Sequence, residues 1–122
     1  MKTILLVDDS STILMSLSDI LGKAGYHVEE ATNGAKAIDK LNSGVRPSLV
    51  ITDINMPVMN GIEFIQAARK LSATRFTPIL VLTTESQQKR RDEAKASGAT
   101  GWLVKPVTGA DLLNVIKQVI PG

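Results

Sequence analysis

The sequence predicts an α/β protein, a doubly wound parallel sheet of five strands with helices on both faces. Five short segments of strand length, four of them largely apolar, alternate with helical patterns along the 122 residues. Strands separated by single helices form parallel sheets with right-handed crossovers. The residues Leu49–Thr52 are all aliphatic or β-branched, as in a strand covered on both faces. We expect one domain over residues 1–122, with no output domain after it.

The first half of the chain predicts two strands, each followed by a helix. These are the strand Thr3–Val7, the helix Ser11–Lys23, the strand His27–Ala31 and the helix that follows Asn33 and Gly34. Apolar residues recur at helical spacing in the first helix. Gly25 ends that helix, because glycine readily adopts the left-handed conformation found just after helix ends.

The second half of the chain predicts three further strands and three helices. The strands are Leu49–Thr52, Ile79–Leu82 and Trp102–Val104. A polar side chain that accepts a hydrogen bond from the third residue after it commonly begins a helix. Three pairs have this spacing: Asn60 with Glu63, Thr84 with Gln87, and Thr108 with Asp111.

The helix predicted from Ser86 to Ser97 has an unusual composition. It contains no large apolar residue, so that only Ala94 and Ala96 are suited to face the sheet. At about 25 cal/mol per Å² of buried apolar area, such a helix gains little from docking. We therefore expect it to be one of the least stable elements. Because it follows Thr83 closely, it is a candidate for a two-state switch.

The composition excludes several classes of protein. The chain has no cysteine, which rules out disulfides and thiol chemistry. With 14 Lys and Arg residues against 12 Asp and Glu, the net charge of +2 is too small to indicate nucleic-acid binding. The first apolar run is too short for a signal peptide or a membrane span. We expect a cytoplasmic monomer that binds neither nucleic acid nor membrane.

Polar residues follow four of the predicted strands: Asp8 and Asp9 the first, Asp53 the third, Thr83 the fourth and Lys105 the fifth. The carboxyl ends of parallel strands meet at one edge of the sheet. Carboxylates about 4 Å apart repel by about 4 kcal/mol per pair at an effective dielectric of 20, and Mg²⁺ relieves this repulsion. Carboxylate, metal, lysine and hydroxyl are the parts of a phosphoryl-transfer site with an aspartate nucleophile.

These residues, together with Pro106 after Lys105, resemble the receiver domain of two-component response regulators. The resemblance runs from Lys2 to the last helix. The stretches Thr-Asp-Ile-Asn-Met-Pro and Gly-Ala-Thr-Gly-Trp-Leu-Val-Lys-Pro look most like single-domain chemotaxis regulators of the CheY type. The resemblance implies a flavodoxin-like sheet with strand order 2-1-3-4-5.

The resemblance also implies roles for the acidic residues. Asp53 matches the aspartate that accepts the phosphoryl group. Asp9 matches the direct Mg²⁺ ligand and Asp8 its water-linked partner. The backbone carbonyl of Asn55 stands where the family supplies a further metal ligand.

Four more positions match residues that act around the phosphoryl group. Lys105 matches the lysine that pairs with the acyl phosphate, and Thr83 the hydroxyl that binds a phosphate oxygen after transfer. Pro106 matches the family's cis-proline, and Trp102 its switch aromatic. The chain departs from the family in having Val107 where phenylalanine is common, and in having tryptophan where tyrosine or phenylalanine is usual. Both departures concern how far the aromatic can rotate.

The resemblance implies a signalling protein rather than an enzyme. It would take a phosphoryl group from a histidine kinase and then bind a flagellar motor switch or another signalling protein. The binding surface would be formed by the helix predicted from Ser86 to Ser97, the fifth strand and the last helix. A phosphorelay intermediate and a phosphate sink remain alternatives. A phosphoaspartate hydrolase fits less well, since it needs an Asp-x-Asp pair where this chain has Asp8-Asp9. A nucleotide carrier would need a glycine-rich phosphate loop, which the sequence lacks.

Overall fold

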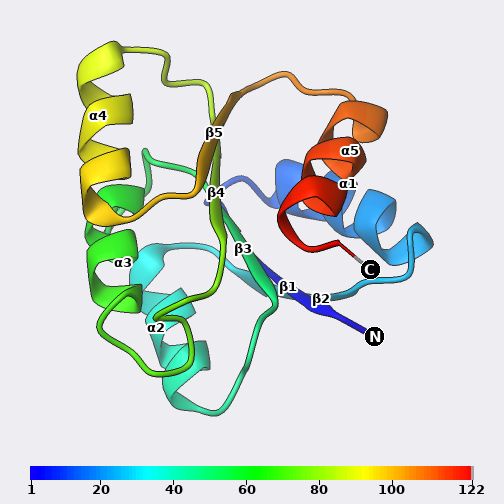
Figure 1. The fold of residues 1–122 in the computed structure, drawn as a ribbon, viewed down its shortest axis with the longest axis horizontal. Helices are drawn as coiled ribbons and strands as arrows, with labels where there is room; N and C mark the ends of the chain where they lie inside the picture. Colours follow the sequence, from blue (N-terminus) through cyan, green and yellow to red (C-terminus); the bar gives the residue numbers. More distant parts are fainter. Residues whose placement is uncertain (122) are drawn as a thin grey trace.

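The computed structural model describes residues 1–121, within which five parallel strands and five helices alternate (Figure 1). The elements are β1 (Thr3–Val7), α1 (Ser11–Lys23), β2 (His27–Ala31), α2 (Gly34–Asn42), β3 (Leu49–Thr52), α3 (Gly61–Ala68), β4 (Ile79–Thr83), α4 (Gln88–Ser97), β5 (Gly101–Val104) and α5 (Gly109–Val119). The strand order is β2-β1-β3-β4-β5, and all pairs are parallel. The predicted fold class and strand order are confirmed.

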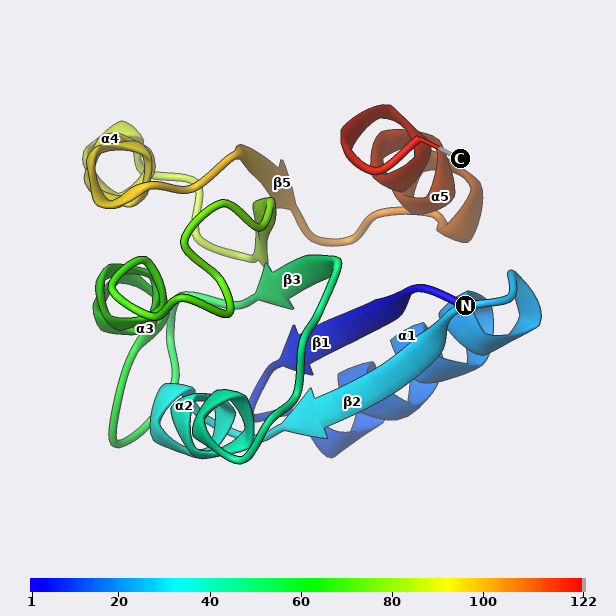
Figure 2. The same ribbon diagram turned by 60° about the horizontal axis from the view of Figure 1, so that its bottom comes forward.

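The sheet is the middle of three layers. Helices α1 and α5 cover one face, and α2, α3 and α4 cover the other (Figures 1 and 2). Successive strand residues point to opposite faces, so Leu5 joins the core under α2–α4 and Leu6 the core under α1 and α5. Every residue of β3 is buried, as predicted for a central strand. Within residues 1–121, no helix is long and apolar enough to span a bilayer.

Two of the three predicted helix starts are confirmed. At the start of α3, Glu63 N donates to Asn60 Oδ1 at 2.9 Å, and Asn60 N donates to Glu63 Oε1 at 3.0 Å. At the start of α5, Asp111 N donates to Thr108 Oγ1 at 3.0 Å. Each arrangement satisfies amides that have no partner inside the helix.

The prediction for the start of α4 is wrong. The helix begins at Gln88 rather than Ser86, and among the described residues the side chain of its N-cap Gln87 accepts no hydrogen bond from the helix amides. The predicted pair Thr84 and Gln87 does not form, because the Gln87 amide donates to Glu85 Oε1 at 2.9 Å instead. A turn within the loop thus takes the amide that the capping box required.

The prediction that α4 docks weakly is confirmed in part. Ala94 is 1% exposed, but Ala96 is exposed and does not face the sheet, contrary to expectation. By contrast, Leu112 and Ile116 of α5 are both fully buried. Since alanine has little side-chain area to bury, α4 is held by less apolar contact than α5.

Candidate functional site

Three carboxylates converge at the carboxyl edge of the sheet, as predicted. Asp8 and Asp9 follow β1, and Asp53 follows β3, the neighbouring strand. Asp53 N donates to Val7 O at 2.9 Å, which places the two strand ends level. One oxygen from each carboxylate lies within 4.8 Å of the others. Asp8 and Asp53 are buried, whereas Asp9 is exposed to solvent.

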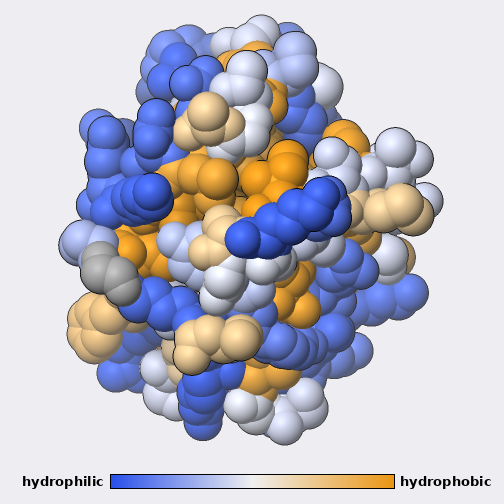
Figure 3. All heavy atoms as spheres, turned by 90° about the vertical axis from the view of Figure 1, so that its right-hand side faces the viewer, coloured by the Kyte–Doolittle hydropathy of each residue, from blue (hydrophilic) through white to orange (hydrophobic). Residues whose placement is uncertain are grey.

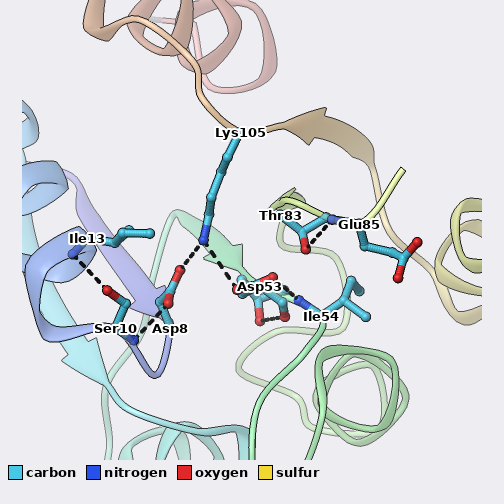
Figure 4. Close-up of polar contacts among 9 residues, drawn as sticks. Asp8, Ser10, Ile13, Asp53, Ile54, Thr83, Glu85 and Lys105 are labelled. Carbon is cyan, nitrogen blue, oxygen red and sulfur yellow. Dashed lines mark hydrogen bonds and ion pairs between the residues drawn. The ribbon is translucent and has the colours of Figure 1, made fainter. Parts of the chain in front are cut away.

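Lys105 crosses this edge from the end of β5 to reach two of the acids (Figure 4). Its Nζ lies 2.7 Å from Asp8 Oδ2 and 3.2 Å from Asp53 Oδ2. The lysine side chain is only 11% exposed, so these pairs are little screened by solvent. The remaining oxygens are also held: Ser10 N donates to Asp8 Oδ1 at 2.9 Å, and Ile54 N to Asp53 Oδ1 at 2.6 Å.

The donor set of this edge suits a hard divalent cation. Three carboxylates facing one ammonium leave two formal negative charges, which one divalent ion would neutralise. All the available donors are oxygens, the ligands that Mg²⁺ prefers. Asn55 is exposed two residues beyond Asp53 and offers a backbone carbonyl in the adjoining loop. The residues present therefore fit Mg²⁺.

Thr83 ends β4, the strand that pairs with β3, and is fully buried. Its Oγ1 accepts a hydrogen bond from Glu85 N at 3.2 Å, and Figure 4 shows this hydroxyl on the same edge as Asp53. The hydroxyl proton remains available for an acceptor at that edge. Thr83 thus connects the site to the loop that leads into α4.

The two other predicted switch residues lie on and just after β5. Trp102 is half-buried and packs against the core that α3 and α4 cover. Its Nε1 is buried and has no hydrogen-bond partner among residues 1–121. The peptide bond between Lys105 and Pro106 is cis.

The structure adds Gly61, the first residue of α3, to the site. Gly61 N donates to Ile54 O at 2.9 Å, which draws the start of α3 against the backbone after β3. A Cβ at Gly61 would lie 2.1 Å from Asp53 O and 2.9 Å from Ile54 Cα. Only glycine permits this approach, so Gly61 fixes the backbone that carries Asp53.

Gly61→Ala is expected to destabilise the protein by about 3 kcal/mol, because the added methyl group collides with backbone atoms that cannot rotate away. Gly22 provides the matched control, since a Cβ there meets nothing within 4 Å in the exposed part of α1. Gly22→Ala should instead stabilise by about 0.5–1 kcal/mol. Urea denaturation of both variants measures this difference. Equal midpoints would contradict the close contact between Gly61 and the backbone after β3.

Comparison with known proteins identifies the arrangement. Residues 4–117 match the family model of the response regulator receiver domain. The chain belongs to this family. The chemotaxis protein CheY of Thermotoga maritima is 38% identical over 119 residues, 97% of each chain. The protein PilH of Pseudomonas aeruginosa is 35% identical over 122 residues, 100% of each chain.

Solved structures give the same result for this receiver domain. The chemotaxis protein CheY4 of Vibrio cholerae has a TM-score of 0.92 at 47% sequence identity, and the match covers 98% of each chain. Receiver domains bind Mg²⁺ at an acidic pocket, take phosphate from histidine kinases and bind downstream signalling targets. The resemblance found in the sequence is therefore confirmed at the level of the family.

Proposed function

We propose that this receiver domain accepts a phosphoryl group on Asp53 from a histidine kinase, with Mg²⁺, and then changes its binding surface to signal in chemotaxis. The observation that carries the proposal is the position of Lys105, whose Nζ pairs with both Asp8 and Asp53 beside the exposed carboxylate of Asp9. This arrangement presents a nucleophile, a fixed cation and a set of metal ligands on one open edge.

The chemistry assigns a role to each of these side chains. An oxygen of Asp53 forms the bond to phosphorus as the bond to the imidazole nitrogen of the donor breaks, and the electron pair leaves on that nitrogen. Bound Mg²⁺ would neutralise charge on the transferred group, held by Asp9, Asp53 and the Asn55 carbonyl, with Asp8 linked through water. Lys105 then pairs with the acyl phosphate.

A groove beside Lys105 supports docking of the phosphodonor. It has a volume of about 250 Å³ and lies between the first turns of α1 and the segment after β5. Its lining is largely apolar and includes Ile13, Leu17, Pro106 and Val107. Figure 3 looks onto the side of the molecule that carries α1 and α5, where apolar side chains gather between polar ones. A helix of the donor would bury its apolar face there.

The output surface is proposed to comprise α4, β5 and α5, with a motor switch or another signalling protein as the target. A second groove of about 330 Å³ supports this assignment, since it lies between α4 and β5 and is lined by Arg91, Lys95 and Trp102 among others. A role as a phosphorelay intermediate or a phosphate sink would use the same site but no such output surface. In the signalling role, the affinity for the target should rise on phosphorylation. This rise distinguishes the signalling role from these alternatives.

Removal of the metal tests the proposed chemistry. With acetyl phosphate and Mg²⁺ the protein should gain a phosphoryl group, detected by mass spectrometry, and excess chelator should prevent this.

Asp9→Asn should weaken Mg²⁺ binding by about tenfold or more, as even outer-shell changes do at metal sites. Asp19→Asn, an exposed substitution on α1, is the control. Equal Mg²⁺ affinities in a calorimetric titration would remove Asp9 from the ligand set.

A further inference from the structure

Arg69 joins two segments that are far apart in the sequence. Arg69 is the residue directly after α3, and it is half-buried. Its guanidinium donates to backbone carbonyls of both segments. Nε and Nη2 donate to Gly98 O at 3.1 and 2.8 Å, at the end of α4. Nη1 donates to Thr74 O at 2.7 Å and to Thr77 O at 2.6 Å, in the loop before β4. One planar guanidinium group therefore ties the end of α4 to that loop.

The C-terminal end of α4 is stabilised in further ways. Gly98 closes the helix in the left-handed conformation, with φ of 114°, and Gln66 Nε2 donates to Ser97 Oγ at 3.2 Å. The guanidinium also lies at the negative end of the helix dipole, where a cation is favourable. Burial lowers the pKa of Arg69, but arginine keeps its charge in proteins. Ala94, the buried residue of α4, belongs to this half of the helix as well.

The N-terminal end of α4 has the opposite character. Within the described residues, the Gln87 side chain accepts no hydrogen bond from the first amides of the helix, which have no partner inside it. Three consecutive cations, Lys89, Arg90 and Arg91, occupy the first turn, at the positive end of the helix dipole, where positive charge is unfavourable. The helix is therefore fixed at one end and weakly held at the other.

We propose that Arg69 is a positioning residue that makes the C-terminal end of α4 a pivot, so that the switch displaces the N-terminal turn alone. The direction of movement follows from Thr83, whose hydroxyl accepts from Glu85 N in the loop before that turn. When the hydroxyl turns toward a phosphoryl oxygen, the loop is pulled and the free end of α4 follows. This last step rests on the proposed function, whereas the pivot is a property of the unphosphorylated protein.

Spin labels can test the pivot directly because the chain has no cysteine. Lys89→Cys and Ala96→Cys place a label at either end of α4, and Lys36→Cys on α2 gives each a common partner. Electron–electron distance measurements on the free protein should give a narrow distribution for position 96 and a broader one for position 89. With Mg²⁺ and beryllofluoride, a stable phosphoryl mimic, position 89 should shift while position 96 stays unchanged.

Arg69→Ala should broaden the distribution at position 96 to the width seen at position 89, without added beryllofluoride. Lys70→Ala is the matched control, as it removes an exposed neighbouring cation. Arg69→Lys keeps the charge but not the planar set of donors, and it should broaden position 96 too, so it carries the test if Arg69→Ala does not fold. An unchanged position 96 in the folded variant would overturn the proposal, as would equal shifts at both ends with beryllofluoride. Failure to bind beryllofluoride, seen by ¹⁹F NMR, would contradict the proposed function instead, and the free-protein comparison would still decide the role of Arg69.

Discussion

Asp53→Asn protein is expected to keep its mass when incubated with acetyl phosphate and Mg²⁺, whereas the unaltered protein gains a labile phosphoryl group. The amide is nearly isosteric with the carboxylate, and its oxygen can still accept from Ile54 N, so the fold is preserved. It lacks the negative oxygen that attacks phosphorus and that pairs with Lys105. The expected effect is a complete loss of uptake, measured by intact-protein mass spectrometry.

The controls separate Asp53 from the carboxylates beside it. Asp8 also pairs with Lys105, at the shorter distance of 2.7 Å, so it is the obvious competitor as a nucleophile. Peptide mapping of the phosphorylated protein should place the group on Asp53 alone. A stable adduct on Asp53→Asn, or a modified peptide containing Asp8 and Asp9, would show that the acceptor had been assigned wrongly.

Thr83→Ala is expected to take up phosphate but to lose its response in α4. The substitution removes a hydroxyl that is fully buried and bonded to Glu85 N, while Asp53 and Lys105 stay in place. Hydrogen exchange in the unaltered protein with beryllofluoride should change mainly from Thr83 through the first turn of α4, and around Trp102. In Thr83→Ala these changes should disappear, and affinity for the target should stay at its resting level.

Thr83→Ser is the matched control, because it restores the hydroxyl without the methyl group. It should recover most of the response in hydrogen exchange, whereas a role for the methyl group in packing alone would leave it as defective as Thr83→Ala. Equal exchange in Thr83→Ala and unaltered protein would contradict the coupling. Changes confined to α1 would contradict it as well, since that helix covers the other face of the sheet.

The fold was predictable because its signals are local and repeated. The capping box of Asn60 and Glu63 forms as its spacing predicts, and every strand except β2 is a largely apolar run of ordinary length. The start of α4 was not predictable in this way, because Thr84 and Gln87 have the correct spacing but the loop supplies Glu85 as a nearer acceptor. Two local patterns competed there, and the spacing of residues does not reveal which one has the lower free energy.

The acidic site was predictable for a different reason. In a parallel sheet, topology alone brings the residues after each strand to one edge, so Asp8, Asp53 and Lys105 meet as expected. Gly61 and Arg69 were not recognised, because their roles depend on contacts with Asp53 and Gly98 across tertiary structure. A glycine at the first position of a helix and an arginine at the end of one are individually unremarkable in sequence.

The buried Nε1 of the half-buried Trp102 has a consequence for the resting state of the protein. Its Nε1 gives up a hydrogen bond to water and finds no acceptor within residues 1–121, which costs about 1–3 kcal/mol. The apolar contacts that the ring makes with the core offset this loss. The conformation seen here is therefore less favoured than for a phenylalanine in the same place, and a conformation that exposes Nε1 would regain a bond to solvent. The unpartnered Nε1 thus lowers the free-energy gain from burying Trp102. The free-energy difference between the resting conformation and one with Nε1 exposed is correspondingly smaller.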